Sequence, residues 1–529
     1  MKIKLNAKSL LGLLLVTSAF GNEVPSTALQ KNVFKAIRNE MIRLDGEGLI
    51  SRRDRSENFF ETTEKLALSI DQNTSLTDFF STFKRLDATY TNLHSSVIFP
   101  KEVSDKILIP WYKRQSIWML AEVNKTSAKY IVDLIEDPAL KSLISEGDEI
   151  IAINGRSISS WLDENFLFCK YPLAIQCQRM FESNLLSLNL SWKGDTDLTY
   201  SIKHNDKVIE AKMNFFDDAS EKDPLKKRCD YKADKRYPGF KLIHLGFSAC
   251  LYEKINDPSI ALLRIVSFQY TRNTSGANPY KRVREEVDAL AKVWLPNAHQ
   301  YKNLIIDLLD NGGGNAPIPY YEILFKNKFQ EQFYQIKKTP EFEDKRLRSA
   351  MIWDDSSHEL QFQEYLINGV WDSLRYGEFA PPEPMFCADD EKACTGPLFE
   401  PKEHDFNGRV HLMVNERCVS SCDGFVWAIK QQLDADLYGF YQAADSTYSR
   451  LRIDAIKDDT SKGFHIEMNP QNDPLPKDLI VAQVVAMSRS TGPNGEIFSG
   501  KPLELKEFVP YRFNEFYPSK VLKKILDQL

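Results

Sequence analysis

The strongest constraint on the fold lies at residues 411–433, where an apolar strand pattern passes through a polar turn into an amphipathic helix pattern. The stretch His411-Leu-Met-Val414 has the composition of a short buried strand. Apolar side chains then recur at helical spacing, at Phe425, Val426, Ile429 and Leu433. Ser420 stands where the helix should begin, and Asp423 follows three residues later, which is close to an N-terminal capping box.

A serine at such a turn has two explanations. Serine is a favoured N-cap residue, and from this stretch alone an ordinary cap at Ser420 is the better interpretation. The start of a helix also offers free backbone N–H groups and the positive end of the helix dipole, which suit a nucleophile. In that case the N–H of Ser421 could stabilise an oxyanion. The remainder of the chain decides between the two explanations.

The N-terminus has the pattern of a secretory signal peptide at residues 1–21. Its basic residues are Lys2, Lys4 and Lys8. Residues 10–20 form an apolar run that is too short to span a bilayer, and Ala19-Phe-Gly21 places small residues at a cleavage site. We therefore expect a mature chain that starts at Asn22 and is secreted or periplasmic, with no membrane span.

Composition describes an ordinary globular protein with more than one domain. The chain has 529 residues, of which 43% are hydrophobic and 27% charged, and this length suggests two or three domains. The net charge of −6 gives no reason to expect a nucleic-acid partner.

Eight cysteines in an exported chain permit disulfide bonds. Pairing between sequence neighbours is plausible, although spacing does not fix it; the pairs would be 169–177, 229–250, 387–394 and 418–422. Zinc is less favoured, because no paired CxxC or HxxxH accompanies the cysteines. We expect neither a metal nor a cofactor.

Four regions follow the signal peptide. Residues 22–104 are predicted to be helical, with His94 between a polar turn and a strand. Residues 105–216 are rich in short strands, and the segment GDEIIAING at 147–155 resembles the corresponding segment of PDZ domains. Residues 217–257 read as a linker, and residues 258–529 as an α/β core with an insertion at 330–408.

The core contains a second unusual turn, in which an apolar strand at 304–308 runs into three glycines at 312–314. The Lys-Ser/Thr pair of a phosphate-binding loop is absent. The glycines instead allow backbone N–H groups to approach a ligand or another loop closely.

Four segments together resemble the C-terminal processing (tail-specific) serine peptidases, in the order of that family. The segments are LLRIVSF at 262–268, IIDLLDNGGG at 305–314, VNERCVSSCD at 414–423 and GKPLELKEFVP at 500–510. The resemblance implies a multidomain α/β (α+β) fold: an N-terminal helical region, a PDZ-like β domain and a crotonase-like α/β peptidase core.

One departure from the family pattern selects a branch of it. The lysine base of the processing peptidases stands about twenty-five residues after the serine, where this chain has Asp445. Another branch, which includes the tricorn core and the chlamydial protease-like activity factor, uses a histidine ahead of the PDZ-like domain. His94 occupies such a position.

The resemblance to the histidine-using branch implies a site made of Ser420 as nucleophile, His94 as base and Glu504 as orienting carboxylate. The N–H groups of Ser421 and of Gly312 or Gly313 would form the oxyanion hole. It further implies a serine endopeptidase acting on proteins or peptides, and a possible homodimer. Two alternatives remain open: an inactive binding or carrier protein of the same fold, and a PDZ-type adaptor of the cell envelope.

Overall fold

The structure is a computed structural model. It describes residues 26–45, 59–89, 92–98, 113–166, 169–181, 198–217, 228–268, 279–314, 317–329, 333–343, 371–381, 383–384, 400–445, 450–454, 464–465, 482–486, 488–492, 496–497 and 500–529. The predicted signal peptide lies outside these residues, and so do Cys387 and Cys394.

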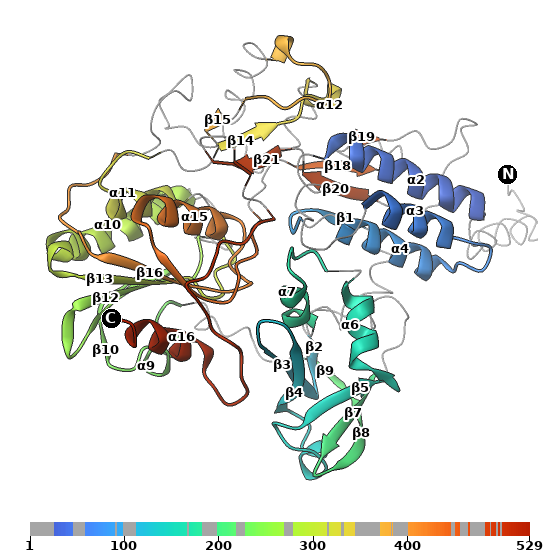
Figure 1. The fold of residues 1–529 in the computed structure, drawn as a ribbon, viewed down its shortest axis with the longest axis horizontal. Coiled ribbons are helices and arrows are strands. Elements are labelled where there is room, and N and C mark those ends of the chain that lie inside the picture. The colour runs from blue at the N-terminus through green and yellow to red at the C-terminus, as the bar shows by residue number, and fades with distance from the viewer. Residues whose placement is uncertain are drawn as a thin grey trace, which may run out of the picture.

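Three N-terminal helices form a layer beside a four-stranded sheet (Figure 1). They are α2 (Thr27–Leu44), α3 (Phe59–Ser69) and α4 (Leu76–Thr89). The sheet order is β1-β20-β18-β19, with β1 (Ser96–Ile98), β18 (Arg450–Asp454), β19 (Phe464–His465) and β20 (Ala482–Ala486). Helix α2 buries Val33, Ile37 and Met41, which recur at helical spacing.

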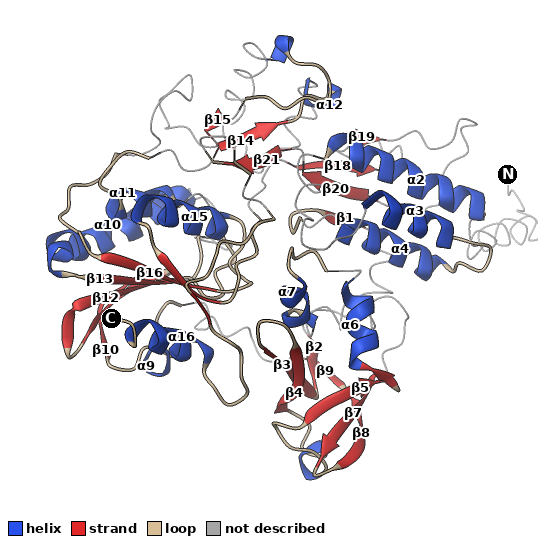
Figure 2. Cartoon of the chain, in the orientation of Figure 1, coloured by secondary structure: helices blue, strands red, loops and turns tan. Residues whose placement is uncertain are grey.

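The predicted PDZ-like region contains an antiparallel sheet with two short helices (Figure 2). Its strands are β3 (Ile117–Val123), β4 (Ala128–Ile135), β5 (Glu149–Ile153), β6 (Arg156–Ser157), β7 (Leu198–His204) and β8 (Lys207–Met213). Helices α6 (Ile158–Phe166) and α7 (Ala174–Arg179) accompany them, and β2 (Lys113–Gln115) pairs with β9 (Phe215–Asp217). Asn154 and Gly155 both have positive φ, as a tight hairpin turn between β5 and β6 requires. We call this unit the β domain.

A seven-stranded sheet in the order β10-β11-β12-β13-β16-β17-β22 forms the core. The strands are β10 (Phe240–Leu245), β11 (Ala249–Lys254), β12 (Asp257–Ile265), β13 (Asn303–Asp307), β16 (Arg409–Val414), β17 (Asp436–Gly439) and β22 (Glu507–Phe508). Helices α10 (Pro279–Asn297), α11 (Ile318–Leu324) and α15 (Ser421–Leu433) cover one face, and α9 (Ala233–Arg236) and α16 (Tyr517–Leu526) the other (Figure 1). From β12 to β22 the strands run parallel, so their carboxyl ends meet at one edge.

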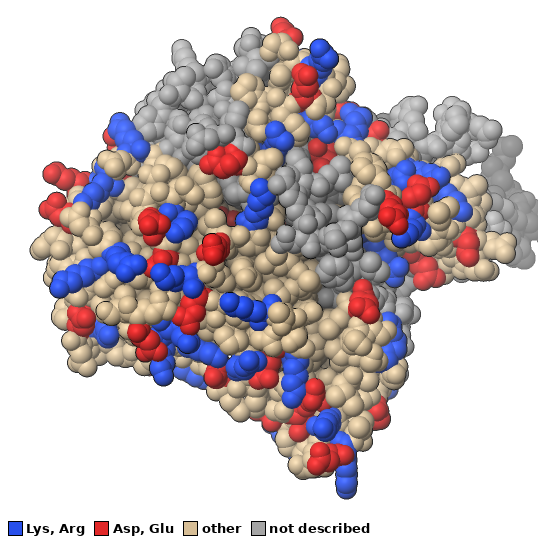
Figure 3. Space-filling view, viewed as in Figure 1, with Lys and Arg blue, Asp and Glu red and all other residues tan. Residues whose placement is uncertain are grey.

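A small sheet joins β14 (Phe333–Ile336) and β15 (Glu383–Pro384) of the predicted insertion to β21 (Ser488–Thr491), which lies outside it. Helix α12 (Pro340–Glu343) follows β14. Figure 3 shows acidic and basic side chains interspersed over the visible face. No helix in the described ranges is long and apolar enough to cross a membrane.

Two sequence expectations differ from the structure. The predicted linker at 217–257 contains β10 and β11, because Cys250, Leu251 and Tyr252 form a buried apolar run that pairs with β12. From the sequence, the apolar runs at 437–441 and 480–487 predict two strands of one sheet. The second run instead forms β20, which pairs with β1 across Ser96 and Val484.

A buried polar cluster links two core strands to the segment before β10. The carboxylate of Asp307 accepts hydrogen bonds from Tyr237 Oη at 2.6 Å and from Arg264 Nη1 at 2.8 Å. Arg264 and Asp307 are both buried. Burial, and then the neighbouring Asp307 charge, raise the pKa of Tyr237 well above its ordinary value, so the phenol stays a donor.

We predict that Arg264→Met destabilises the protein by about 3 kcal/mol, because it removes the nearer of the two cations of the buried Asp307 carboxylate and leaves only Arg236, at 3.6 Å. Urea unfolding measures the change. The matched control is Lys241→Met, which removes the cation of the Lys241–Glu253 pair; this lysine is 55% exposed, so the change should cost about 1 kcal/mol or less. Equal losses in the two variants would contradict the importance of the buried pair.

Candidate active site

Ser420 lies at the turn between β16 and α15 in an unusual backbone conformation. Its φ is 64° and its ψ is −128°, and its side chain makes no capping hydrogen bond to the helix. A positive φ is costly for a residue with a Cβ and persists only where the surroundings impose it. Here the N–H of Ser420 donates to the backbone carbonyl of Asp445 at 2.7 Å. The ordinary N-cap explanation therefore does not account for this serine.

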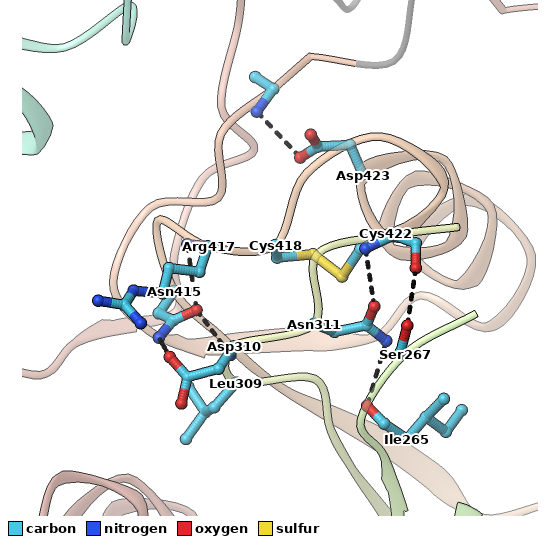
Figure 4. The surroundings of a disulfide bond; sticks show 12 residues. Ile265, Ser267, Leu309, Asp310, Asn311, Asn415, Arg417, Cys418, Cys422 and Asp423 are labelled. Carbon is cyan, nitrogen blue, oxygen red and sulfur yellow. Dashed lines mark hydrogen bonds between the residues drawn. A yellow bond between two sulfur atoms is a disulfide. The ribbon is translucent and has the colours of Figure 1, made fainter. Parts of the chain in front are cut away.

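A disulfide bond spans the same turn. Cys418 and Cys422 are bonded on either side of Ser420, and both are fully buried (Figure 4). Of the predicted neighbour pairs, Cys169–Cys177 and Cys229–Cys250 are also bonded. A cross-link over five residues restricts the conformations available to the turn.

His94 approaches Ser420 from the N-terminal region. The imidazole lies in the turn between α4 and β1, with Nε2 at 3.2 Å from Ser420 Oγ and Nδ1 at 3.1 Å from Asp445 Oδ1. The side chain of Asn92 holds this turn, since its Oδ1 accepts the N–H of His94 at 2.8 Å and the N–H of Ser95 at 3.0 Å. With Nδ1–H donating to the carboxylate, Nε2 is an acceptor for the serine hydroxyl.

Asp445 is the carboxylate that orients this histidine. Its Oδ1 faces His94, its Oδ2 accepts the backbone N–H of Leu93, and its side chain is 3% exposed. The loop that carries it is held by Asp423, whose carboxylate accepts the N–H of Ala444 at 2.9 Å and of Asp445 at 2.8 Å. Burial raises the pKa of the Asp423 carboxyl well above its ordinary range.

Glu504, the carboxylate expected from the sequence, lies elsewhere. It is exposed, and it precedes β22, whose neighbouring Lys506 N–H donates to Leu437 O in β17. Because β22 is parallel to β17, Glu504 lies toward the amino ends of the strands, whereas Ser420 follows the carboxyl end of β16. Glu507, the next carboxylate along this segment, pairs with Lys524 of α16 at 3.0 Å. The carboxylate that contacts His94 belongs to Asp445. Asp445 stands where the processing peptidases have their lysine base.

The glycine turn packs directly against the serine turn. A Cβ on Gly313, whose φ is 79°, would lie 2.4 Å from Val419 O, so only glycine allows this approach. The N–H of Gly313 donates to Asn311 Oδ1 at 2.9 Å, and Asn311 donates in turn to Ile265 O (Figure 4). The N–H of Gly313 is thereby engaged, and the neighbouring Gly312 is exposed.

The arrangement suits acid–base chemistry without a metal ligand set. Over the described part of the chain, no group of three or more His, Cys, Asp or Glu side chains is placed to hold a metal ion. A serine hydroxyl, an imidazole and a buried carboxylate stand in hydrogen-bonding sequence. Such a set can deprotonate the hydroxyl as it attacks an electrophilic carbon.

Comparison with known proteins identifies the core. Residues 259–452 match the model of peptidase family S41. Two solved structures, mature CPAF and mature CPAF complexed with lactacystin, are similar in fold, with TM-scores of 0.61 and 0.60 and 14% sequence identity each. The alignments cover 94% and 95% of this chain, and 96% and 98% of those chains. No curated protein matches the chain in sequence.

We predict that Asp445→Asn lowers kcat for peptide hydrolysis by about 10²–10⁴-fold, because an amide at this position disfavours the imidazolium and the required tautomer. The matched control is Glu504→Gln, which should stay within about threefold of the unchanged protein. Steady-state kinetics on a fluorogenic peptide substrate checks both variants. The reverse pattern, an active Asp445→Asn beside an inactive Glu504→Gln, would return the orienting role to Glu504.

Proposed function

Residues 259–452 belong to peptidase family S41, so the chain is a serine-type peptidase, and we propose that it is an endopeptidase with Ser420 as nucleophile and His94 as general base. The observation that carries the proposal is the alignment of Ser420 Oγ, His94 and Asp445 through contacts of 3.2 and 3.1 Å. The two contacts join residues 351 and 326 positions apart, so chain connectivity alone does not bring these groups together.

In the proposed reaction, His94 Nε2 takes the hydroxyl proton as Ser420 Oγ attacks the peptide carbonyl carbon. Negative charge develops on the carbonyl oxygen, where the N–H groups of Ser421 and Gly312 would receive it. The imidazolium, stabilised by Asp445, then gives the proton to the leaving amine. A water molecule, deprotonated by His94, hydrolyses the acyl-enzyme and restores the serine.

We place this peptidase in a secreted or periplasmic setting. The disulfides Cys169–Cys177, Cys229–Cys250 and Cys418–Cys422 fit an oxidising compartment. The signal-peptide pattern at residues 1–21 supports the same location. A homodimeric state remains a prediction from the sequence.

An inactive carrier of the same fold is the second candidate from the sequence. The conformation of Ser420 argues for the enzyme, since strain of this kind is costly and concentrates at functional sites. A carrier would have no need of an imidazole between the hydroxyl and a buried carboxylate.

We predict that the purified mature chain hydrolyses casein, and that Ser420→Ala and His94→Ala each lower the rate by at least about 10³-fold. Residual hydrolysis by the variants is compared with that of buffer, and circular dichroism establishes that they are folded.

Two other outcomes are informative. Unimpaired hydrolysis by His94→Ala would place the base elsewhere. A wild-type chain that is inactive, even after limited proteolytic activation, would favour the binding-protein alternative.

A further inference from the structure

One loop of the β domain contacts both sides of the site. We call residues 169–177 the disulfide loop, because Cys169 and Cys177 close it with a Cα–Cα distance of 5.6 Å. It follows α6 and runs into α7, at the end of the β domain nearest the N-terminal helices (Figure 1). Neither the cysteines nor this loop belongs to the proposed catalytic set.

The first contact of the disulfide loop is to the turn that carries His94. Lys170 Nζ donates to the backbone carbonyl of Ser95, the residue after His94, at 2.6 Å. The same ammonium group pairs with Asp87 Oδ2 at 2.5 Å. Asp87 is 1% exposed and also accepts a hydrogen bond from Ser95 Oγ at 3.0 Å. A buried carboxylate and a buried carbonyl thus share one cation, which ties the His94 turn to α4 and to the β domain.

The second contact is to the loop that carries Asp445. Gln176 is fully buried, and its Nε2 donates to Gln442 O at 2.7 Å and to Tyr441 O at 3.3 Å. Its Oε1 accepts the N–H of Leu173 at 3.1 Å, which fixes the orientation of the amide. Residues 441 and 442 lie just before Asp445 in the chain, so Gln176 fixes the backbone segment that leads to the orienting carboxylate.

Tyr171 of the disulfide loop is half-buried. Burial, followed by the nearby Glu416 charge, raises the pKa of its phenol above the ordinary value. The charges of Asp423 and Asp445 act in the same direction.

We propose that Lys170 and Gln176 are positioning residues, which hold the His94 turn and the Asp445 loop at catalytic distance, so that the docked β domain completes the active site. The inference rests on the proposed peptidase activity. A displacement of about 1 Å between reacting groups can lower a rate by about 10²-fold.

The test uses Lys170→Met and Gln176→Glu in the full mature chain. Lys170→Met removes the cation and keeps a side chain of similar length. Gln176→Glu keeps an oxygen that accepts the Leu173 N–H, but it replaces the donating amide nitrogen by a second oxygen. That oxygen would face the backbone carbonyl groups of Tyr441 and Gln442. The controls are Lys207→Met and Gln432→Glu, the same exchanges at exposed positions of β8 and α15. Lys170→Arg tests whether a cation alone restores the contact.

Each variant is measured by kcat and KM on a fluorogenic peptide, and by amide hydrogen exchange at residues 92–98 and 440–445. We expect kcat to fall about 10–10²-fold with KM within about threefold, and exchange to accelerate in both segments. Lys170→Arg should recover part of the loss, and the controls should match wild type.

The proposal is overturned if kcat and exchange stay within twofold of wild type, or if the exposed controls lose as much activity. If the wild type itself is inactive, the proposed function fails. The hydrogen-exchange data alone then decide whether Lys170 and Gln176 hold the two segments. Faster exchange confined to the disulfide loop would overturn that role.

Discussion

The site depends on the position of Asp445, which connects three parts of the chain. Its backbone carbonyl accepts the N–H of Ser420, and its carboxylate accepts from His94 Nδ1 and from the N–H of Leu93. Its own N–H is received by Asp423 at the start of α15. One residue therefore fixes the backbone of the serine turn and the orientation of the imidazole. Loss of its position would release both, since each has a positive-φ or turn conformation that needs external support.

Folding must bring distant segments together before this site exists. Strand β1, directly after His94, pairs with β20, so that Ser96 lies opposite Val484. The sheet beside the N-terminal helices thus takes three of its four strands, β18, β19 and β20, from the C-terminal part of the chain. Pairing strands that lie so far apart in the sequence closes long loops. Loop closure costs chain entropy, which slows folding. The β domain then contributes Lys170 and Gln176 across the same junction.

Patterns with a local cause could be predicted from the sequence. The strand–turn–helix unit at Ser420 follows from the change in apolar period from the strand to the helix, and the close-packed glycine turn follows from three glycines after a buried strand. The family resemblance selected Ser420 and His94, and Ser420 Oγ lies 3.2 Å from His94 Nε2. These features depend on residue type and spacing.

The remaining features depend on tertiary geometry. Asp445 and Glu504 are both carboxylates near motif positions, and only the direction of β22 beside β17 sends Glu504 to the far edge. The Asn311 side chain, which engages Gly313, and the strands inside the expected linker are equally invisible in local patterns. The charged residues that precede β10 and β11 gave this region the composition of a linker, so the sequence did not predict these two strands.

The central claim is that Ser420 is a nucleophile made reactive by His94. The most direct measurement is labelling by a fluorophosphonate, followed by peptide mass mapping of the adduct. The account predicts a single adduct on the peptide that contains Ser420, with a labelling rate at least about 10²-fold lower in His94→Ala. An adduct on a different serine, or equal labelling of the His94→Ala chain, would contradict it.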